Sequence, residues 1–238
     1  MPIFVHIIET TIMELSEAIV RRHSVRNYTS APLPQNIVET LNSAITEINK
    51  QAQLNIQLIT NEPRAFTGIF AYGKFSGVTN YFVMAGEKCA DLHEKIGYYG
   101  EKLVLLAQQL GLNTCWAGLS YRKIADTYTL NANETILCYI ALGYGENQGV
   151  SHRIKTIEQI SNACSVDTPQ WFVDGCKAAL LAPTAINQQK FRFEYAGGNS
   201  VVAKRGFSLV GYTRIDLGIA KLHFEIGAKN SRLKWLDE

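Results

Sequence analysis

The sequence lacks the features that mark a membrane protein or a nucleic-acid-binding protein. Its 238 residues contain 23 lysines and arginines against 21 aspartates and glutamates, which gives a formal net charge of +2 at pH 7. So small an excess provides no broad attraction to a nucleic-acid backbone or an acidic membrane surface. No apolar run reaches the roughly 18 residues of a membrane-spanning helix, and Ile3 to Ile8 lacks the basic start and cleavage site of a signal peptide. We therefore expect a cytoplasmic protein without nucleic-acid or membrane partners.

Cysteine is scarce and its spacing fits neither a disulfide framework nor a metal site. The five cysteines are odd in number, widely spaced, never arranged as C-x-x-C and never beside clustered histidines, so we expect no metal. Two of them stand in apolar runs, which is typical of small buried hydrophobic residues rather than nucleophiles. These two are Cys115 and Cys138.

Several catalytic motifs are also missing. The sequence contains no Walker A motif, no H-E-x-x-H and no G-x-S-x-G, which disfavours kinases, zinc peptidases and α/β-hydrolases. The segment Gly143 to Gly149 has the spacing G-x-G-x-x-x-G, one residue longer than a dinucleotide-binding fingerprint, and no helix pattern follows it. A Rossmann domain is therefore not expected.

What is present is the composition and patterning of a globular α+β protein. Residues are 47% hydrophobic, 10% aromatic and 18% charged, which argues against disorder. A capping box at Thr11 and Glu14 opens the first helix. Periodicity predicts further helices over 37–48, 92–110 and 216–227, near Ile157, after Pro169 and briefly between 117 and 135, strands over 54–58, 81–85, 114–117, 135–143, 191–195 and 201–204, and an irregular loop over 63–77.

The order of these elements contains a weak internal repeat. Ile37 to Ile59 has the same helix, turn and strand layout as Phe172 to Tyr195, and Gly100 to Trp116 resembles Gly218 to Trp235. Two readings stay open on pattern alone. The chain has two related halves, or two helix–strand units share an ordinary spacing.

Two basic segments are candidate anion sites. Arg21 to Arg26 follows the first helix, and its guanidinium groups and serine hydroxyl can converge on a phosphate. His152 to Lys155 follows a strand, and residues 153 and 155 project together from an extended chain. The alternatives are cations that complement a helix C-terminus and a solvated face, respectively.

A third candidate joins a helix to a strand. Ala182 to Phe191 reads A-P-T-A-I-N-Q-Q-K-F, and its small residues let a flat ligand approach the backbone. Asn187 and Gln189 add amide donors and acceptors. Taken alone, the segment is equally a turn that ends a helix.

Together these segments resemble the FMN-dependent nitroreductases. Arg22 to Tyr28, R-H-S-V-R-N-Y, resembles the family's opening R-[RH]-S-x-[RK]-x-[FY], and Gly111 to Gly118 is similar to its G-L-G-T-C-W-[IL]-G. Ala141 to Tyr144 and the pair Arg153 and Lys155 are similar to the A-L-G-Y and R-R-K-P-L-E-E-L blocks. Four motifs follow in order over residues 12–163. The resemblance implies a nitroreductase-like fold with mixed, mainly antiparallel sheets flanked by helices.

One motif is displaced. Family members carry A-P-S-A-x-N-x-Q-P-W soon after the first signature, but Ala44 to Asn49 reads A-I-T-E-I-N, and the motif stands at 182–189 instead. In the family the flavin lies at a homodimer interface between these two segments. The resemblance therefore implies a single-chain pseudo-dimer. Residues 1–163 form the half with the phosphate site, residues 164–238 an abbreviated second half in the same compact unit, with one FMN per chain and a monomer favoured over a homodimer.

The resemblance also assigns roles within the site. The FMN phosphate is assigned to Arg22, Ser24, Arg153 and Lys155 with His23 in the same loop, the pyrimidine edge to Arg26, flavin N5 to the backbone near Gly118 and Leu119, and the facing wall to Pro183, Thr184, Ala185, Asn187 and Gln189. Lys190 and Phe191 replace the family's Pro-Trp, which alters that wall.

The implied reaction needs no catalytic side chain. NADH or NADPH passes a hydride to flavin N5, leaves, and is replaced by a nitroaromatic or quinone in a ping-pong cycle. Arg26 stabilises the reduced, anionic flavin electrostatically. Two other functions remain open on the sequence, namely a flavin-binding storage or sensor protein without turnover, and a module for another phosphorylated small molecule.

Overall fold

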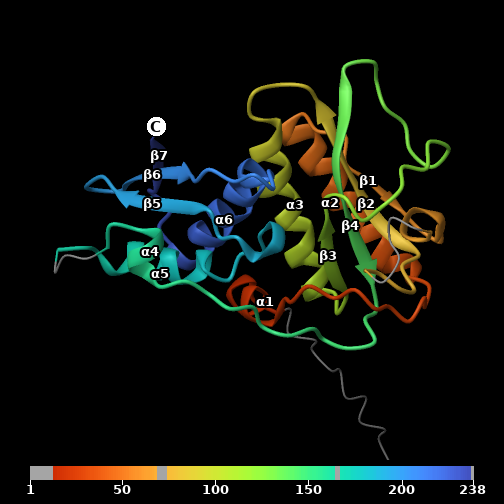
Figure 1. The fold of residues 1–238 in the computed structure, drawn as a ribbon, viewed down its shortest axis with the longest axis horizontal. Coiled ribbons are helices and arrows are strands. Elements are labelled where there is room, and N and C mark those ends of the chain that lie inside the picture. The colour runs from red at the N-terminus through yellow and green to blue at the C-terminus, as the bar shows by residue number, and fades with distance from the viewer. Residues whose placement is uncertain (1–12, 69–73, 164–166, 237–238) are drawn as a thin grey trace, which may run out of the picture.

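The computed structural model describes residues 13–68, 74–163 and 167–236, and it shows two β-sheets on opposite sides of a helical centre (Figure 1). This arrangement is the α+β class that the sequence predicts. No helix in these ranges is long and apolar enough to cross a membrane. The helices are α1 Leu15–Arg21, α2 Gln35–Ala52, α3 Leu92–Gln109, α4 Ile157–Ile160, α5 Gln170–Ala179 and α6 Thr213–Ala228, with short 3-10 turns η1 Arg64–Phe66 and η2 Ala185–Asn187.

The first sheet has four antiparallel strands. Their order is β1 Gln57–Ile59, β2 Asn80–Glu87, β4 Glu134–Gly143 and β3 Asn113–Ala117. In the register of the central pair, Tyr81 lies opposite Ala141. The predicted strands over 81–85, 114–117 and 135–143 are confirmed to within a few residues.

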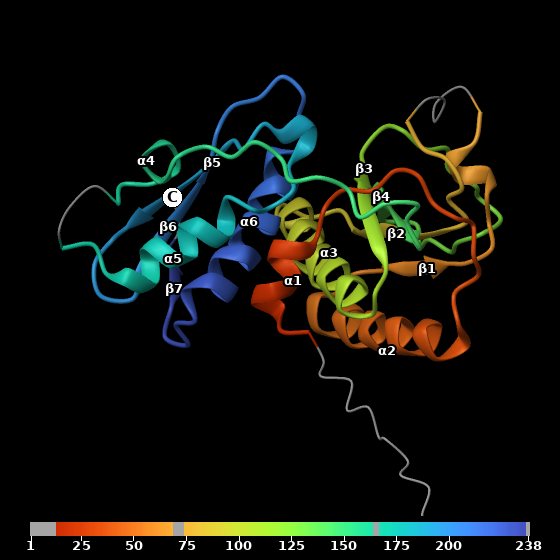
Figure 2. The same cartoon turned by 90° about the horizontal axis from the view of Figure 1, so that it is seen from below.

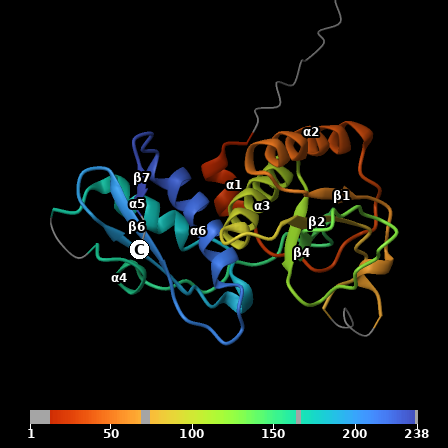
Figure 3. The same cartoon turned by 90° about the horizontal axis from the view of Figure 1, so that it is seen from above.

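Both faces of this sheet are covered, which explains the continuous apolar run in β2. Because side chains alternate along a strand, Phe82 and Met84 face the main core with α2 and α3, and Tyr81 and Val83 face a second cluster that includes Tyr139. Figures 2 and 3 show α2 and α3 on the same side of the sheet. A strand buried on both faces needs no polar alternation.

The second sheet is a shorter version of the first. Its order is β5 Phe191–Tyr195, β6 Ser200–Arg205 and β7 Lys234–Leu236, with β5 antiparallel to β6 and β6 parallel to β7. In the first sheet, β2 and β3 also run in the same direction, but β4 lies between them. If a strand equivalent to β4 were left out of the first sheet, β2 and β3 would be neighbours, as β6 and β7 are in the second.

Helices α3 and α6 cross at the centre through a reciprocal contact of glycines. A Cβ on Gly97 would overlap the carbonyl of Ile215, and a Cβ on Gly218 would overlap the carbonyl of Glu94. Such a mutual exchange of partners is typical of two-fold symmetry. The internal repeat in the sequence pairs Gly100 with Gly218, whereas the contact in the structure pairs Gly97 with Gly218, about one helical turn earlier.

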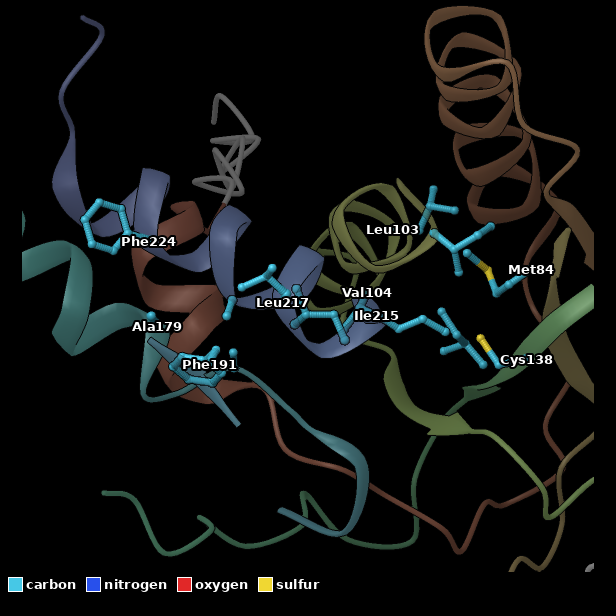
Figure 4. Packing of buried hydrophobic residues seen from close by; sticks show 14 of the residues in the cluster. Met84, Leu103, Val104, Cys138, Ala179, Phe191, Ile215, Leu217 and Phe224 are labelled. Atoms are coloured by element: carbon cyan, nitrogen blue, oxygen red, sulfur yellow. The ribbon is translucent and has the colours of Figure 1, made fainter. Parts of the chain in front are cut away.

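The core is continuous across this crossing. Figure 4 shows Val104 of α3 beside Ile215 and Leu217 of α6, with Met84 and Cys138 toward the first sheet and Phe224 toward the second half. All six of these residues lie in one hydrophobic cluster. The halves are therefore not separated by a polar interface.

Three predictions of secondary structure need correction. The short helix expected between 117 and 135 is wrong, because residues 118–133 form turns and bends in which Tyr121 stacks on Tyr139 at 4.1 Å between ring centroids. The strand expected over 54–58 begins only at Gln57, with an isolated bridge at Leu54. Strand β7 was not predicted. The expected capping box is also wrong at Glu14, which is the N-cap of α1 and makes no side-chain capping hydrogen bond, while Thr11 lies outside the described residues.

Candidate functional site

Two adjoining cavities lie between the halves. The first, cavity A, has a volume of about 330 Å³, and the second, cavity B, about 290 Å³. Small-molecule sites have volumes of about 300 Å³ or more, so cavity A exceeds this limit and cavity B lies just below it. Residues of both candidate segments line both cavities, namely Ser24, Arg26, Pro183, Thr184 and Ile186. Two parts of the chain about 160 residues apart in sequence therefore share one cleft.

The basic segment reaches the cleft as an extension of the first sheet. After α1, Ser24 forms a parallel bridge with Thr114 of β3, and the Val25 N–H donates to the Thr114 carbonyl at 3.0 Å. The alternation of an extended chain buries Val25 in the core and turns Ser24 and Arg26 toward the cavities.

The facing wall is a strained loop. Between α5 and β5, Ile186, Asn187 and Gln189 have φ angles of 47°, 56° and 46°. A positive φ is unfavourable for non-glycine residues and most of all for a β-branched one, so the surroundings must hold this conformation. Within the loop, the Asn187 N–H donates to the Thr184 carbonyl at 2.9 Å, and the Gln189 N–H to the Thr184 hydroxyl at 3.0 Å.

The basic pair Arg153 and Lys155 supports this loop and does not line either cavity. The Arg153 carbonyl accepts hydrogen bonds from the side-chain amides of Asn187 and Gln189, each at 2.8 Å. Lys155 Nζ donates to the Gln189 carbonyl at 2.6 Å. Gln189 is 3% exposed and is likewise absent from the lining. Their assignment to the flavin stays a prediction.

Asp216 of α6 supports the loop from the other side. Its carboxylate, which lines cavity A, accepts the Ala185 N–H at 3.0 Å and the Gln188 side-chain amide at 2.7 Å. The residue is 2% exposed. Burial raises the pKa of Asp216 to about 6, against a smaller lowering by these hydrogen bonds.

A further contact between the halves closes the end of cavity A. The Tyr212 hydroxyl donates to the Gly118 carbonyl at 2.9 Å, and a Cβ on Gly118 would strike the Tyr212 ring. Only glycine fits there. Leu119, the next residue, is 78% exposed and lines the same cavity.

A buried charged network lies behind cavity B. Arg22 is 3% exposed, and its Nε lies 3.7 Å from a carboxylate oxygen of Glu101, which is fully buried. Glu101 also accepts hydrogen bonds from Trp116 Nε1 and His223 Nε2, both at 2.9 Å. The other ring nitrogen of His223 lies 3.3 Å from the Ala178 carbonyl.

In this network the Glu101 carboxylate faces two basic side chains, those of Arg22 and His223, and one donor has no acceptor. Arg22 Nε is buried and has no hydrogen-bond partner. Burial lowers the pKa of Arg22, while nearby Glu101 opposes that shift. His23 and His152, which line cavity B, also have pKa values lowered, chiefly by burial. The surplus of donors suits an anion.

The two cysteines that line cavity A are not nucleophiles. Cys115 is 3% and Cys138 2% exposed, and burial raises the pKa of both thiols. A raised pKa removes the thiolate, which is the reactive form. The expectation of small buried hydrophobic residues is therefore confirmed. In the described ranges, no group of three or more His, Cys, Asp or Glu side chains could hold a metal ion.

Most of the predicted site residues meet in the cleft. Ten of them line cavity A, cavity B or both, namely Arg22, His23, Ser24, Arg26, Gly118, Leu119, Pro183, Thr184, Ala185 and Asn187. Asp216, Tyr212 and the Glu101–His223 pair were not predicted as part of the site. The sequence offers one weak signal for each. Glu101, Asp216 and His223 are polar residues on the apolar faces of α3 and α6, and Tyr212 is an aromatic residue directly before α6.

The fold and cleft define a nitroreductase-type α+β protein, and sequence comparison agrees. The family model described as "Putative TM nitroreductase" matches residues 14–228, and the chain belongs to this family. No curated protein is significantly similar in sequence.

Several solved structures are similar to this chain. A putative nitroreductase from Thermotoga maritima has 21% identity and a TM-score of 0.66, with 95% of this chain and 88% of that chain covered. Nitroreductase A from Vibrio parahaemolyticus has 18% identity and a TM-score of 0.51, with 66% and 79% covered. A putative nitroreductase from Desulfovibrio desulfuricans in complex with FMN has 18% identity and a TM-score of 0.49, with 65% and 96% covered. At the identities of the first two, the likeness is one of fold.

Proposed function

We propose that this protein is an FMN-dependent oxidoreductase that uses NADH or NADPH to reduce nitroaromatics or quinones. The observation that carries the proposal is the shared cleft, in which Ser24 and Asn187 line the same cavity from different halves. These segments carry the two motifs that resemble the flavin-binding motifs of FMN-dependent nitroreductases. Membership of the nitroreductase family supports the same chemistry.

Cavity B fits a phosphate. Its lining brings together Arg22, His23, Ser24 and His152, whose side chains all carry hydrogen-bond donors. A phosphate dianion accepts several charge-assisted hydrogen bonds at once, which would satisfy these donors. Glu101 holds Arg22 from behind and fixes the direction of its guanidinium. Arg153 and Lys155 act here through the loop that they support.

Cavity A fits a flat aromatic ring. One wall is Gly118 and Leu119 with Trp116, and the other is Pro183, Thr184 and Ala185. FMN bound there would supply the hydride chemistry. Arg26 lies at the junction of both cavities, where its positive charge stabilises negative charge on the ring. The thiols of Cys115 and Cys138 contribute apolar surface.

We infer that the complete site lies within one chain. The part up to residue 163 supplies the cationic segment and β3, and the part from 164 onward supplies the loop and α6. The reciprocal contact of Gly97 and Gly218 supports a pseudo-dimer of these halves. One FMN per monomeric chain follows.

The spectrum of the purified protein tests this function. A yellow protein that bleaches anaerobically with NADH or NADPH and recovers its colour with a quinone or nitroaromatic supports the proposal. A yellow protein inert to both nicotinamides points to storage or sensing. A colourless protein that takes up no FMN contradicts a flavin function.

A further inference from the structure

The loop that separates the two cavities is held in an unfavourable conformation. Its three non-glycine residues with positive φ are Ile186, Asn187 and Gln189. This backbone conformation is unfavourable for residues other than glycine, so the loop needs fixed partners outside itself. Those partners come from two directions, the strip of residues 153–155 on one side and α6 on the other.

The partner on α6 is a single carboxylate with two donors. Asp216 accepts from the Ala185 backbone, which precedes the strained residues, and from the side chain of Gln188, which lies between Asn187 and Gln189. The same Gln188 amide also donates to the Gly211 carbonyl at 3.0 Å. Asp216 therefore fixes the loop at two points and, through Gln188, joins it to the chain that enters α6.

This arrangement is costly for the folded protein. Asp216 is almost completely buried, and no salt bridge to it exists among the described residues. Gln188 Oε1 is also buried without a hydrogen-bond partner. A buried carboxylate without a cation and an orphaned amide oxygen both lower stability. An arrangement kept at such a cost is better explained by function than by folding.

We propose that Asp216 is a positioning residue, whose buried carboxylate holds the 184–189 loop in the shape that walls both cavities, at the expense of stability. The expected effect on flavin binding rests on the proposed function. The anchoring of the 184–189 loop by Asp216 does not, because it needs no ligand. Asp216 touches the loop and not the reacting atoms, so its role is indirect.

The anchoring depends on pH. The pKa of Asp216 is about 6. Protonation turns one of its acceptor oxygens into a donor, which then faces the Ala185 N–H or the Gln188 side-chain amide, both of which are also donors. Among the other groups that line cavity A, burial raises the pKa of Tyr212 and of the Cys115 and Cys138 thiols, away from this pH range. The remaining charged side chains of this lining are Arg26 and Lys74.

Other charged or titratable groups also lie near the site. His93 and Glu94 of α3 lie against the first turns of α6, and His23 and His152 line cavity B. The phosphate of FMN itself titrates near pH 6. Comparing Asp216→Asn with the wild type isolates the contribution of the Asp216 carboxyl group. Riboflavin is the suitable ligand, because it has no phosphate that titrates in this range.

The test uses the whole protein with Asp216→Asn and the matched control Asp174→Asn. Asp174 also accepts from a glutamine amide, that of Gln170, but it lies exposed on α5 and lines no cavity. Hydrogen exchange of the flavin-free proteins at pH 7.5 is measured first. We expect the Ala185 and Asn187 amides to exchange at least tenfold faster in Asp216→Asn, with β5 and β6 unchanged and Asp174→Asn like the wild type.

Thermal stability separates positioning from ordinary structural support. Since the pKa of Asp216 is higher in the folded than in the unfolded protein, its carboxyl group favours folding most below about pH 4, and this contribution is lost as the pH rises through 6. Asp216→Asn should therefore have a Tm at pH 7.5 no lower than that of the wild type. A Tm lowered together with faster exchange throughout the fold would overturn the proposal.

Riboflavin binding gives the functional consequence. We expect Asp216→Asn to weaken it about tenfold at pH 7.5, and wild-type affinity to fall between pH 7.5 and 5 more steeply than that of the variant. Gln188→Leu, which removes one donor, should act in the same direction and non-additively, and it serves if Asp216→Asn does not fold. Unchanged exchange at Ala185, or parallel pH profiles, contradicts the proposal. If neither flavin binds any of these proteins, the proposed function fails, while the exchange data still decide the role of Asp216.

Discussion

The two halves of the molecule bring different chemistry to one cleft. The first half supplies cations and a hydroxyl on an extended segment that is part of its sheet, namely Arg22, Ser24 and Arg26. The second half supplies small and amide-bearing residues on a strained loop fixed by Asp216. A phosphate needs concentrated charge, whereas a neutral ring needs a close-fitting wall. Neither half alone provides both.

The difference extends to what holds each segment. The cationic segment is held by backbone pairing to β3, which tolerates changes of side chain. The loop is held by side chains, especially Asp216 and Gln189, whose loss leaves strain uncompensated. We therefore expect substitutions in the second half to change the shape of the site, and substitutions in the first half to change its charge.

The largest effect is expected where the halves share buried charge. Glu101→Leu leaves Arg22 and His223 without their carboxylate and should lower the free energy of unfolding by about 3–5 kcal/mol. Glu94→Gln is the control, because this carboxylate also pairs across α3 and α6, with Lys221, but is 38% exposed and should cost about 1 kcal/mol or less. Urea denaturation measures both. Equal small losses would show that the buried network does not join the halves.

The next largest effect concerns the helix crossing. Gly97→Ala and Gly218→Ala each drive a Cβ into a backbone carbonyl and should each cost at least about 1–3 kcal/mol, although alanine favours helix. Gly206→Ala, where a Cβ meets only ordinary contacts, is the control. Thermal or urea unfolding gives the values. Similar losses at 97 and 218 support the two-fold relation, and a large loss at only one of them argues against it.

A smaller effect should distinguish the phosphate side from the ring side. Ser24→Ala removes a donor of cavity B and should weaken FMN binding by about tenfold or more, since a hydrogen bond to a charged group contributes about 1.5–3 kcal/mol. Riboflavin affinity should be unchanged. Fluorescence titration with both ligands measures the ratio. If both affinities fall equally, the phosphate does not lie in cavity B.

The smallest predicted effect is electronic. Arg26→Gln removes the positive charge at the junction of the cavities and should lower the two-electron potential of the bound flavin by about 30–60 mV, where 30 mV corresponds to about 1.4 kcal/mol. A spectroscopic redox titration measures this shift, and Lys190→Gln, on the exposed face of the loop, should cause none. An unchanged potential in Arg26→Gln would remove the electrostatic role assigned to it.

Local patterns in the sequence were sufficient for much of the fold. The apolar run of β2 and the helical spacing of α3 depend on neighbouring residues, and the structure has both as predicted. The motifs at 22–28 and 182–189 are also local patterns, and residues of both line one cavity. Strand β7 is only three residues long and pairs with a strand about 34 residues earlier, so no local pattern marks it. Residues 118–133 pack against the first sheet, where Tyr121 stacks on Tyr139. This is a tertiary contact, which the periodicity of the sequence does not reveal.

The supports of the site were beyond local patterns for a similar reason. Asp216, Glu101 and His223 act across helices that meet only in the folded molecule. Arg153 and Lys155 show the converse case, since their motif suggests direct contact with a ligand while their atoms bond to the loop. Motifs identify segments, and the tertiary structure decides which atoms face the cavity.

The most direct test of the account is the stoichiometry of flavin on a particle of known mass. Light scattering combined with the flavin absorbance should give one FMN on a single 26.5 kDa chain. One flavin for two chains, or flavin bound only by a dimer, would contradict a complete site within one chain.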